Sequence, residues 1–424
     1  MNHSIKNILA KTVLGSSLFC SFAAHAIPPA DQSNTWGVSE ALTVLRGITL
    51  SGGTVLGSLD AIVVQFPTYT DISILNAALT SLAPIVDTSF KEEGFGHETI
   101  VYNSIENRLI TLFHQKPSLT AYAAGDLFCK GGAWVTSFGQ DVNEATRDAI
   151  PGYRYAMWGV AIGADTAYNE NVIIGAAIDF ANARVKNNVS PGSITIIDNF
   201  EVILYGQVSP GNPLFVNWLT SLGYNDYASD RNINFKTVRL TAASRYHGWQ
   251  FGSQADLGYD ITFDDLYTIP FVDKCCLTQS SLHVTPLVSL NFSYLDFNTY
   301  TETGAGTASQ TIDSPGFSML LGSIGVQLAQ DFTSSTAFYE PEIHFRLFYD
   351  FINSTIETTS QFTGGGPDFF TLGAKPPPGS WNIGASLTTM SEVVGLVFTV
   401  SYDYNHKTDY SSNSGFLRLR YEWV

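Results

Sequence analysis

YEPEIHFRLFYD, residues 339–350, alternates between two chemically different sets of side chains. Successive side chains of a strand point to opposite faces, so odd positions share one face and even positions share the other. The odd face holds six large apolar or ring side chains. The even face holds Phe348 and five ionisable groups, which are Glu340, Glu342, His344, Arg346 and Asp350. A face with five ionisable groups cannot be a packed core, so we expect it to meet water.

The same two-residue period recurs along the chain from Trp134 to Trp423. In VIIGAAIDF, residues 172–180, one face is mostly large and apolar, and the other is small or polar apart from Ile173. A soluble sandwich shows this pattern too, so the ends of the chain have to decide between the two folds. We predict twelve strands separated by turn residues, at 133–140, 154–168, 172–185, 197–208, 213–226, 236–262, 283–297, 316–330, 336–351, 380–390, 393–406 and 413–424.

The first residues match a secretory signal peptide. Lys6 and Lys11 form a basic start, an apolar run follows over 12–23, and Ala24-His25-Ala26 has the small-residue pattern of a cleavage site. The apolar run is too short for a membrane-spanning helix, which needs about 20 residues. We therefore predict that residues 1–26 are removed after Ala26.

The composition of the remaining chain points to lipid contact through strands. It has 38 acidic residues against 19 basic ones, once Lys6 and Lys11 have left with the signal peptide. This acidic balance disfavours nucleic acid as a partner, because phosphate binding requires Lys and Arg. Charged residues make up 14% of the chain, against roughly 25% in a typical soluble domain. After the signal peptide there is no apolar run near 20 residues, and strands cross a bilayer only as a closed barrel.

The number of strands depends on whether residues 236–262 form one strand or two. The apolar residues lie at even positions before Gly248 and at odd positions after it, as a bulge at this glycine would produce. Dividing the segment gives thirteen strands, and keeping it whole gives twelve. Bacterial single-chain barrels have an even number of strands, so we keep it whole.

Loop lengths predict which end of the barrel faces the periplasm. Periplasmic turns are short and outer loops are longer. Short turns follow four even-numbered strands, at 169–171, 209–212, 331–335 and 391–392, and long loops follow odd-numbered strands at 298–315 and 352–379. Residues 263–282 follow the sixth strand and are too long for a periplasmic turn, which is the main discrepancy.

A helix is predicted over residues 98–115, ahead of the first strand. Its apolar residues Val101, Ile105, Leu109 and Leu112 fall on one stripe at helical spacing. Polar residues lie off that stripe, and they include Asn103, Asn107 and Arg108. Two interpretations remain open at this point. The helix could pack on a small soluble N-terminal domain, or it could thread a polar pore.

The last strand has the features of a barrel-assembly signal. Leu417, Leu419, Tyr421 and Trp423 alternate with Arg418, Arg420 and Glu422. Taken with this ending, the C-terminal portion, residues 133–424, resembles the autotransporter β-domain, the translocator of type V secretion. The matching stretches, in order, are WVTSFG (134–139), GVAIGAD (159–165), TETGA (301–305), the run 364–379 and LRLRY (417–421).

This resemblance implies an all-β fold, a single closed antiparallel transmembrane barrel of about twelve strands with an α-helix in its lumen. The implied organisation is a signal peptide at 1–26, a short passenger-like segment at 27–96, the pore helix and linker at 97–130, and the barrel at 131–424. In this arrangement Glu342, His344 and Arg346 line a polar lumen that accommodates the helix around Asn103, Asn107 and Arg108. Tyr421 and Trp423 would carry the assembly signal.

The expected function is insertion in the outer membrane of a Gram-negative bacterium and display or translocation of the short N-terminal segment. The expected partners are outer-membrane lipid, the barrel assembly machinery and periplasmic chaperones, with no nucleic acid, and the barrel is expected to be monomeric. The alternative is a passive pore or a surface-adhesion barrel without translocation. The helix separates these alternatives, because a helix that fills the lumen lowers the conductance of the pore.

The sequence predicts neither an enzyme nor a cofactor or metal site. It has no G-x-S-x-G motif, and Val101 stands where H-E-x-x-H, starting at His97, needs its second histidine. Three cysteines remain after the signal peptide, which are too few for a disulfide scaffold. Cys129 precedes the first strand, and Cys275 and Cys276 lie in the connection after the sixth. We predict a possible disulfide from Cys129 to either of them, with free or intermolecularly bonded thiols as the alternative.

Overall fold

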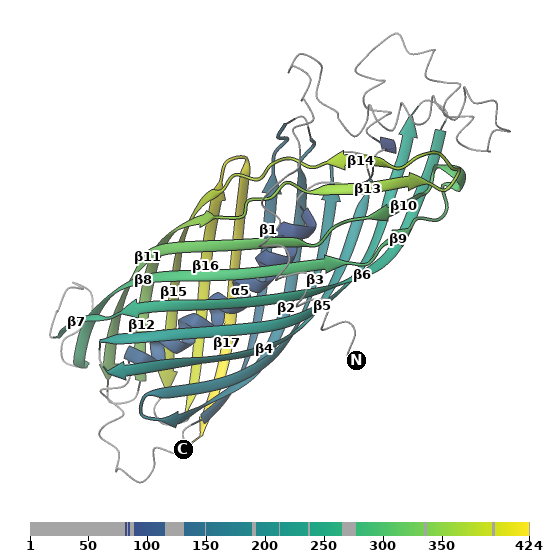
Figure 1. Cartoon of the computed structure of the whole chain (residues 1–424). Coiled ribbons are helices and arrows are strands. Elements are labelled where there is room, and N and C mark those ends of the chain that lie inside the picture. The colour runs from purple at the N-terminus through teal and green to yellow at the C-terminus, as the bar shows by residue number, and fades with distance from the viewer. Residues whose placement is uncertain are drawn as a thin grey trace, which may run out of the picture. The chain divides into compact units, whose positions relative to one another are not determined.

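The computed structural model of the chain describes residues 81–82, 84, 89–114, 131–148, 150–188, 192–211, 213–235, 238–264, 277–334, 337–391 and 395–423. Within these residues, twelve long antiparallel strands close into one barrel, and helix α5 precedes the first of them (Figure 1). The predicted fold, a closed barrel of twelve strands with a helix in its lumen, is confirmed.

The barrel strands are 12 to 22 residues long, whereas crossing a bilayer takes about 9–11 residues of a tilted strand. Several strands therefore extend well beyond the membrane. Their bounds are β1 Gly131–Glu144, β2 Tyr153–Asn169, β3 Val172–Asn187, β4 Ile194–Gly211, β5 Leu214–Phe235, β6 Val238–Tyr259, β8 Leu277–Phe297, β11 Phe317–Ser334, β12 Ala337–Asp350, β15 Gly379–Ser391, β16 Leu396–Lys407 and β17 Tyr410–Trp423.

Neighbouring strands in the sequence are neighbours in the barrel. The first strand, β1, pairs with β2 on one side and with the last strand, β17, on the other. Pairing of β8 with β11 completes the ring, from Phe317 opposite Leu295 to Thr333 opposite Gln279. The ring has no open edge, so its strands satisfy their backbone groups internally, as a structure in hydrocarbon has to.

The alternation that the sequence predicts separates an apolar outer face from the lumen. Along β12, Ile343, Phe345 and Leu347 are exposed on the outside, while Glu340 and Glu342 are buried inside. In the last strand, Leu417 and Leu419 are exposed, and Arg418 and Arg420 are buried. The outer face can therefore contact lipid while the charges stay away from it.

The bulge expected at Gly248 is absent from β6, and that prediction is wrong. Residues of β6 pair with β5 in one unbroken register, from Val238 opposite Phe235 to Tyr259 opposite Leu214. Even positions face inward along the whole strand. What changes near Gly248 is the chemistry of the two faces. Pairing with β8 begins only at Gly248. Between Gly248 and the β5–β6 turn, the hairpin has polar outer residues such as Arg245 and apolar inner ones.

The sixth strand continues further than β6 alone, as the undivided segment predicts. The short strand β7, Ile261–Asp264, pairs with β8 in the register that β6 uses, since Gly258 faces Leu287 and Ile261 faces Val284. Because β8 begins at Leu277, the connection after the sixth strand shortens from the expected 263–282 to 265–276. Those twelve residues lie outside the described part of the chain.

The two ends of the barrel differ in their connections. One end, called here the short-turn end, carries the four predicted short turns, the start of β1 and the end of β17. The other, the long-loop end, carries loops 298–316 and 351–378. Not every connection at the long-loop end is long. Strands β5 and β6 are joined by residues 236–237 and β16 and β17 by 408–409. The β5–β6 strands are extended instead, and β5 runs nine residues past its predicted end.

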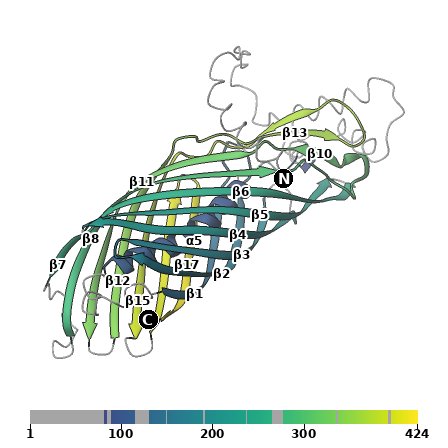
Figure 2. The same ribbon diagram turned by 60° about the horizontal axis from the view of Figure 1, so that its bottom comes forward.

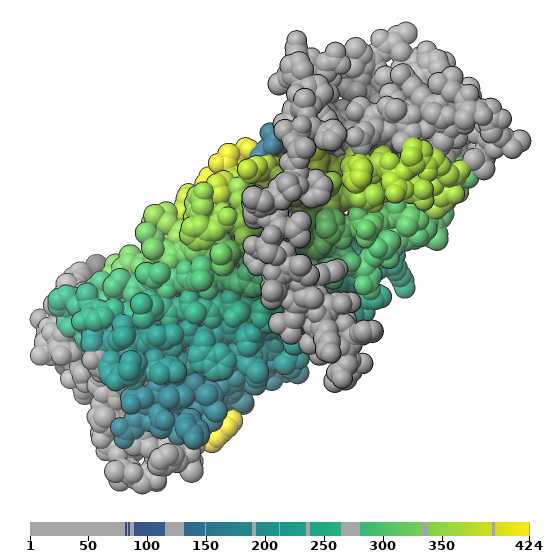
Figure 3. All heavy atoms as spheres, viewed as in Figure 1, coloured from purple at the N-terminus to yellow at the C-terminus, as the bar shows by residue number. Residues whose placement is uncertain are grey.

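The two long loops contain strands that the sequence analysis treated as loop. They form a four-stranded sheet in the order β14-β13-β10-β9, visible at one end of the barrel in Figure 2, and its strands β13 and β14 lie in the yellow-green band of Figure 3. A single bridge, Ala243 to Thr303, ties this sheet's loop to β6. The elements are β9 Tyr300–Thr301, η3 Gly306–Ala308, β10 Gln310–Asp313, β13 Glu357–Phe362 and β14 Phe369–Leu372.

Helix α5, Ser89–His114, runs inside the ring of strands. It begins nine residues before the predicted Glu98, and it ends one residue before the predicted Gln115. Gly94 and Gly96 obscure this first part in the sequence, because glycine disfavours a helix interior. Here they allow close approach to the wall. A Cβ atom on Gly96 would lie 2.8 Å from the Gln140 Oε1 and Tyr155 hydroxyl atoms. Among the described residues no helix has the length and apolar composition needed to cross a bilayer.

A charge on the outer face should destabilise the barrel in lipid. Ile178 lies near the middle of β3 and its side chain is 59% exposed. We expect Ile178→Arg to lower the free energy of unfolding in lipid vesicles by about 2–4 kcal/mol, because arginine near the bilayer midplane loses its hydration. Urea titration followed by heat-modifiable gel mobility measures this change. The control, Ile178→Leu, should stay within about 0.5 kcal/mol of the parent. Equal stability of the two variants would contradict a lipid-facing position.

Candidate functional site: the helix inside the barrel

Helix α5 is buried on most sides although much of it is polar. Lys91, Glu106 and Arg108 are each at most 2% exposed, and the apolar residues Val101 and Leu109 are equally inaccessible. Taking charges out of water is costly unless each finds a partner. The lumen wall must therefore supply specific counter-charges and hydrogen bonds along the helix.

One side of the helix packs on an apolar part of the wall. The predicted stripe residues Val101, Ile105 and Leu109 belong to one buried hydrophobic cluster with residues of β1, β3 and β4, among them Trp134 and Ile203. Small residues leave room for the helix there, including Ala177, Ala181 and Ala183 of β3. The lumen is therefore not polar throughout, which corrects the expectation of a polar lumen. The lumen wall has an apolar part and a charged part, and the helix turns its apolar stripe to the first and its polar residues to the second.

The opposite side of the helix faces charged residues of β12 and β17 and a serine of β15. The Arg346 guanidinium donates two hydrogen bonds to the Glu106 carboxylate, at 3.0 and 2.6 Å. This paired geometry is the strongest arrangement between these two groups. Glu106 is 1% exposed, so the pair fixes helix and wall to each other in a site with little water.

Asn107 brings the predicted helix and lumen residues together. Its amide nitrogen donates to a Glu342 oxygen at 2.7 Å and to the Ser386 hydroxyl at 3.2 Å. Its amide oxygen accepts a hydrogen bond from Arg418 at 2.8 Å. Arg418 also donates to the backbone carbonyl of Ser104. Donor and acceptor atoms of this one side chain are thus both bonded to the wall.

Arg108 bonds to the last strand. It donates to Glu422 at 2.5 Å, and Glu422 also accepts from Arg420 at 3.2 Å. Arg420 in turn makes two hydrogen bonds of 2.7 Å to Asp165 of β2. The contact therefore joins the helix to the strands on both sides of the junction between β17 and β1.

His344 and Asn103 do not bond to one another, but they line the same small cavity. His344 lies between two wall carboxylates, with Glu342 at 3.0 Å and Asp403 at 2.8 Å. The cavity, about 20 Å³, is also lined by Glu106 and Arg346. This volume suits about one water molecule and no larger ligand.

The first half of the helix makes contacts that the sequence analysis missed. Glu92 accepts a hydrogen bond of 2.5 Å from Lys407, next to the β16–β17 turn at the long-loop end. Glu98 accepts one of 2.8 Å from Ser293, and the Gly94 carbonyl accepts one of 3.0 Å from Gln250. A signal for these contacts exists in the sequence. Residues 89–98 place charges on all sides of a helical projection, which suits a helix enclosed by a polar wall rather than one lying on a core.

The remaining predicted residues fall into two groups. Tyr421 and Trp423 project from the outer face of β17 at the short-turn end, 53% and 44% exposed, and their role in assembly stays a prediction. Ala26, Cys129, Cys275 and Cys276 lie outside the described residues. The cleavage site and the disulfide therefore also remain predictions.

Comparison with known proteins identifies this arrangement. The family model described as "Autotransporter beta-domain" matches residues 133–403. Outer membrane protein B of Rickettsia prowazekii is 24% identical over 336 residues, which cover 74% of this chain and 19% of that protein. Outer membrane protein A of Rickettsia conorii is 22% identical, over 70% of this chain and 14% of that protein. The chain thus spans less than a fifth of the length of these relatives.

Solved structures share the fold at low sequence identity. The translocator domain of the autotransporter NalP from Neisseria meningitidis superposes with a TM-score of 0.53 at 14% identity, covering 77% of this chain and 98% of that one. The transport unit of the autotransporter AIDA-I from Escherichia coli gives a TM-score of 0.51 at 12% identity, covering 74% and 97%. At these identities the likeness concerns the fold alone.

Removing one partner of the Glu106–Arg346 pair should destabilise the barrel. We expect Arg346→Met to lower the free energy of unfolding by about 3–5 kcal/mol, because it leaves the buried Glu106 carboxylate without its partner. Urea unfolding in vesicles measures the loss. Glu106→Leu combined with Arg346→Met removes both charges and should recover most of it. Arg154→Met, at an exposed site, should change stability by no more than about 0.5 kcal/mol. A loss in Arg346→Met no larger than this control would show that the pair does not hold the helix.

Proposed function

The chain belongs to the autotransporter β-domain family, and we propose that its barrel displays or translocates its own N-terminal segment at the long-loop end. It is a β-barrel protein of the outer membrane of Gram-negative bacteria. The proposal concerns the finer statement, which is what the barrel does with the residues ahead of its helix.

The direction of α5 through the lumen carries this proposal. Its first turns bond at the long-loop end, where Glu92 meets Lys407 beside the β16–β17 turn. Its last residue, His114, lies near Asp260 and Glu340 at the short-turn end, where β1 also begins. The N-terminal end of the helix therefore lies at the long-loop end of the lumen. Long loops face outward in barrels of this type, so this direction supports display of the N-terminal segment on the cell surface.

Contacts at the long-loop end extend this path. Arg231 of β5 makes two hydrogen bonds to Glu302, at 2.8 and 2.5 Å, and also donates to the Ser81 carbonyl at 3.0 Å. Gln310 of β10 donates to the Leu82 carbonyl at 2.5 Å. Ser81 and Leu82, upstream of the helix, are thus held by the β5–β6 hairpin and by the small sheet, in the region where an exported segment would emerge.

The start of α5 sets the limit of the proposed displayed segment. With a signal peptide at 1–26, the displayed segment would end at residue 88 rather than 96, because α5 already begins at Ser89.

The last strand, with Tyr421 and Trp423 on its outer face, would be recognised by the barrel assembly machinery after delivery by periplasmic chaperones. The proposed mechanism needs no catalytic residue, since burial of the apolar outer face in lipid stabilises the inserted barrel.

Protease treatment of intact cells tests the direction of display. With an epitope tag inserted between residues 27 and 75, external protease should remove the tag from intact cells while the barrel stays whole. A tag inserted in the 392–394 turn, at the short-turn end, serves as the control and should be cut only after the cells are permeabilised. If the N-terminal tag behaves like this control, the display proposal is wrong.

Conductance in planar bilayers tests whether the helix fills the lumen. The intact chain should conduct poorly, and deletion of residues 89–114 should raise single-channel conductance several-fold, because the deletion replaces the packed helix by water. Heat-modifiable mobility would confirm that the shortened chain still forms a barrel. Equal conductance of the two proteins would instead favour a passive pore.

A further inference from the structure

We propose that His114, Asp260 and His283 form a zinc-binding site that holds the end of α5 to the barrel wall. His114 is the last residue of the helix, Asp260 lies between β6 and β7, and His283 lies near the start of β8. All three side chains are buried, and one potential ligand atom from each lies within 4.8 Å of the other two. The site goes beyond the proposed display function and does not depend on it.

The distances suit a single ion. The His114 Nε2 atom lies 3.8 Å from Asp260 Oδ1, and the His283 Nδ1 atom lies 2.9 Å from Asp260 Oδ2. Ligand atoms of a tetrahedral zinc ion, each about 2.0–2.2 Å from the metal, are separated by about 3.4 Å. The observed distances lie on either side of this value. The shorter one is a hydrogen bond between His283 and Asp260, which a bound ion would replace. The two imidazole rings are stacked 4.0 Å apart, so coordination requires them to tilt until each nitrogen lone pair points at the ion.

A second observation supports a ligand here. Neither ring nitrogen of His114 makes a hydrogen bond to a described residue, although the side chain is fully buried. Glu340 Oε2 likewise makes no hydrogen bond and points toward this ring, 3.4 Å from Nδ1. Leaving buried polar atoms without partners costs free energy. An ion bound at the His114 Nε2 atom would satisfy that atom and strengthen the contact of Nδ1 with Glu340.

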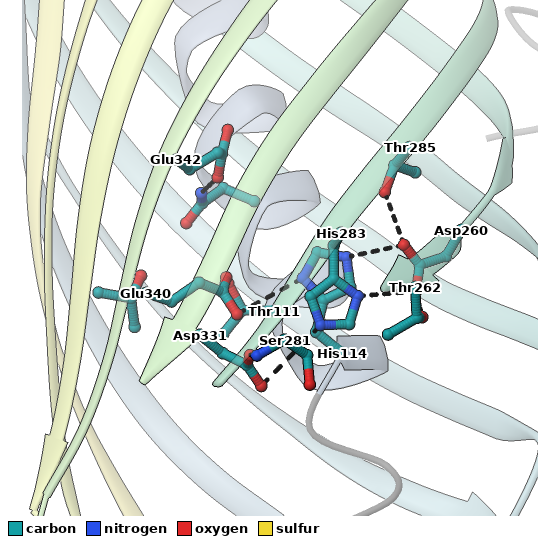
Figure 4. Close-up of polar contacts among 12 residues, drawn as sticks. Thr111, His114, Asp260, Thr262, Ser281, His283, Thr285, Asp331, Glu340 and Glu342 are labelled. Atoms are coloured by element: carbon teal, nitrogen blue, oxygen red, sulfur yellow. Dashed lines mark hydrogen bonds and ion pairs between the residues drawn. The ribbon is translucent and has the colours of Figure 1, made fainter. Parts of the chain in front are cut away.

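The surroundings resemble those of protein zinc sites. Metal-binding histidines usually donate their other nitrogen to a carboxylate. Here Glu340 stands beside the second nitrogen of His114, and Asp331 stands 3.9 Å from that of His283. Thr262 and Thr285 donate to the Asp260 oxygens at 3.0 and 3.1 Å, and Thr111 donates to Glu340 at 2.8 Å. Figure 4 shows Asp260, Glu340 and Asp331 around the two rings, with the threonines beside the carboxylates.

Ligand chemistry selects the metal. Two imidazoles and one carboxylate favour zinc over calcium or magnesium, which prefer oxygen ligands. The described residues contain a second mixed group, His97, Asp179 and Glu201, deeper in the lumen. That group offers one imidazole and two carboxylates, a set that suits zinc less well than two imidazoles and one carboxylate. The group at the short-turn end is also the one close to the barrel mouth.

Zinc titration of the full-length barrel tests the site. The protein, refolded in detergent and stripped with a chelator, is titrated with zinc chloride by isothermal calorimetry. We expect one zinc per barrel. His114→Asn and His283→Asn should each weaken binding at least about 100-fold, and Glu340→Gln, which only orients a ligand, should weaken it about 10–100-fold. The control variant His247→Asn, on the exposed outer face of β6, should bind as the parent does.

Three results would overturn the proposal. The first is a parent barrel that retains no zinc after dialysis, and the second is tight binding that survives His114→Asn but is lost in His97→Asn. Heat-modifiable mobility establishes that each variant is folded. X-ray absorption at the zinc edge of the parent protein needs no variant, and it should show nitrogen and oxygen ligands at about 2.0–2.2 Å. Sulfur ligands at about 2.3 Å, which would come from cysteine, are the third overturning result.

Discussion

Closure of the sheet between β8 and β11 is the constraint on which the rest of the structure depends. Backbone groups in hydrocarbon find no water, so an open edge would leave a row of them unpaired. Once the ring is closed, alternate side chains of every strand must point to lipid or to the lumen. The apolar face seen along β12 and the charged face opposite it are two consequences of this single requirement.

A closed ring of twelve strands also encloses a lumen. Helix α5 fills it, and the chemistry of the two parts is matched around the helix. Small and apolar residues of β3 and β4 meet the stripe that contains Val101 and Leu109. Charged residues of β12 and β17 meet Glu106 and Arg108. Because each of these charges is buried, an unmatched partner would be expensive, and this specificity fixes the helix in one position and direction.

Beyond the membrane the same strands follow a different rule. The β5–β6 hairpin continues without a change of register, yet its outer side becomes polar and its inner side carries Tyr227 and Tyr246, whose rings stack 4.8 Å apart. Water replaces lipid as the surrounding medium there, so apolar residues turn inward as in a soluble protein. The sequence change near Gly248 therefore marks the limit of lipid contact. A bulge at this glycine would produce the same shift of apolar residues from even to odd positions, so the sequence pattern does not separate the two causes.

The sequence by itself determined the fold class, the number of strands, the connection order and the faces of most strands, because a two-residue period and a closed barrel leave few other arrangements. It also identified Asn107, Arg108, Glu342 and Arg346 as residues at the boundary between helix and lumen. Only the tertiary structure decided the partners of these residues. Arg346 bonds to Glu106, and Arg418 bonds to Asn107. The grouping of His114, Asp260 and His283 is likewise invisible in the sequence, since strand register and helix rotation bring together residues that lie far apart along the chain. Local patterns report which medium each side chain meets, and pairing partners depend on contacts that only closure of the ring creates.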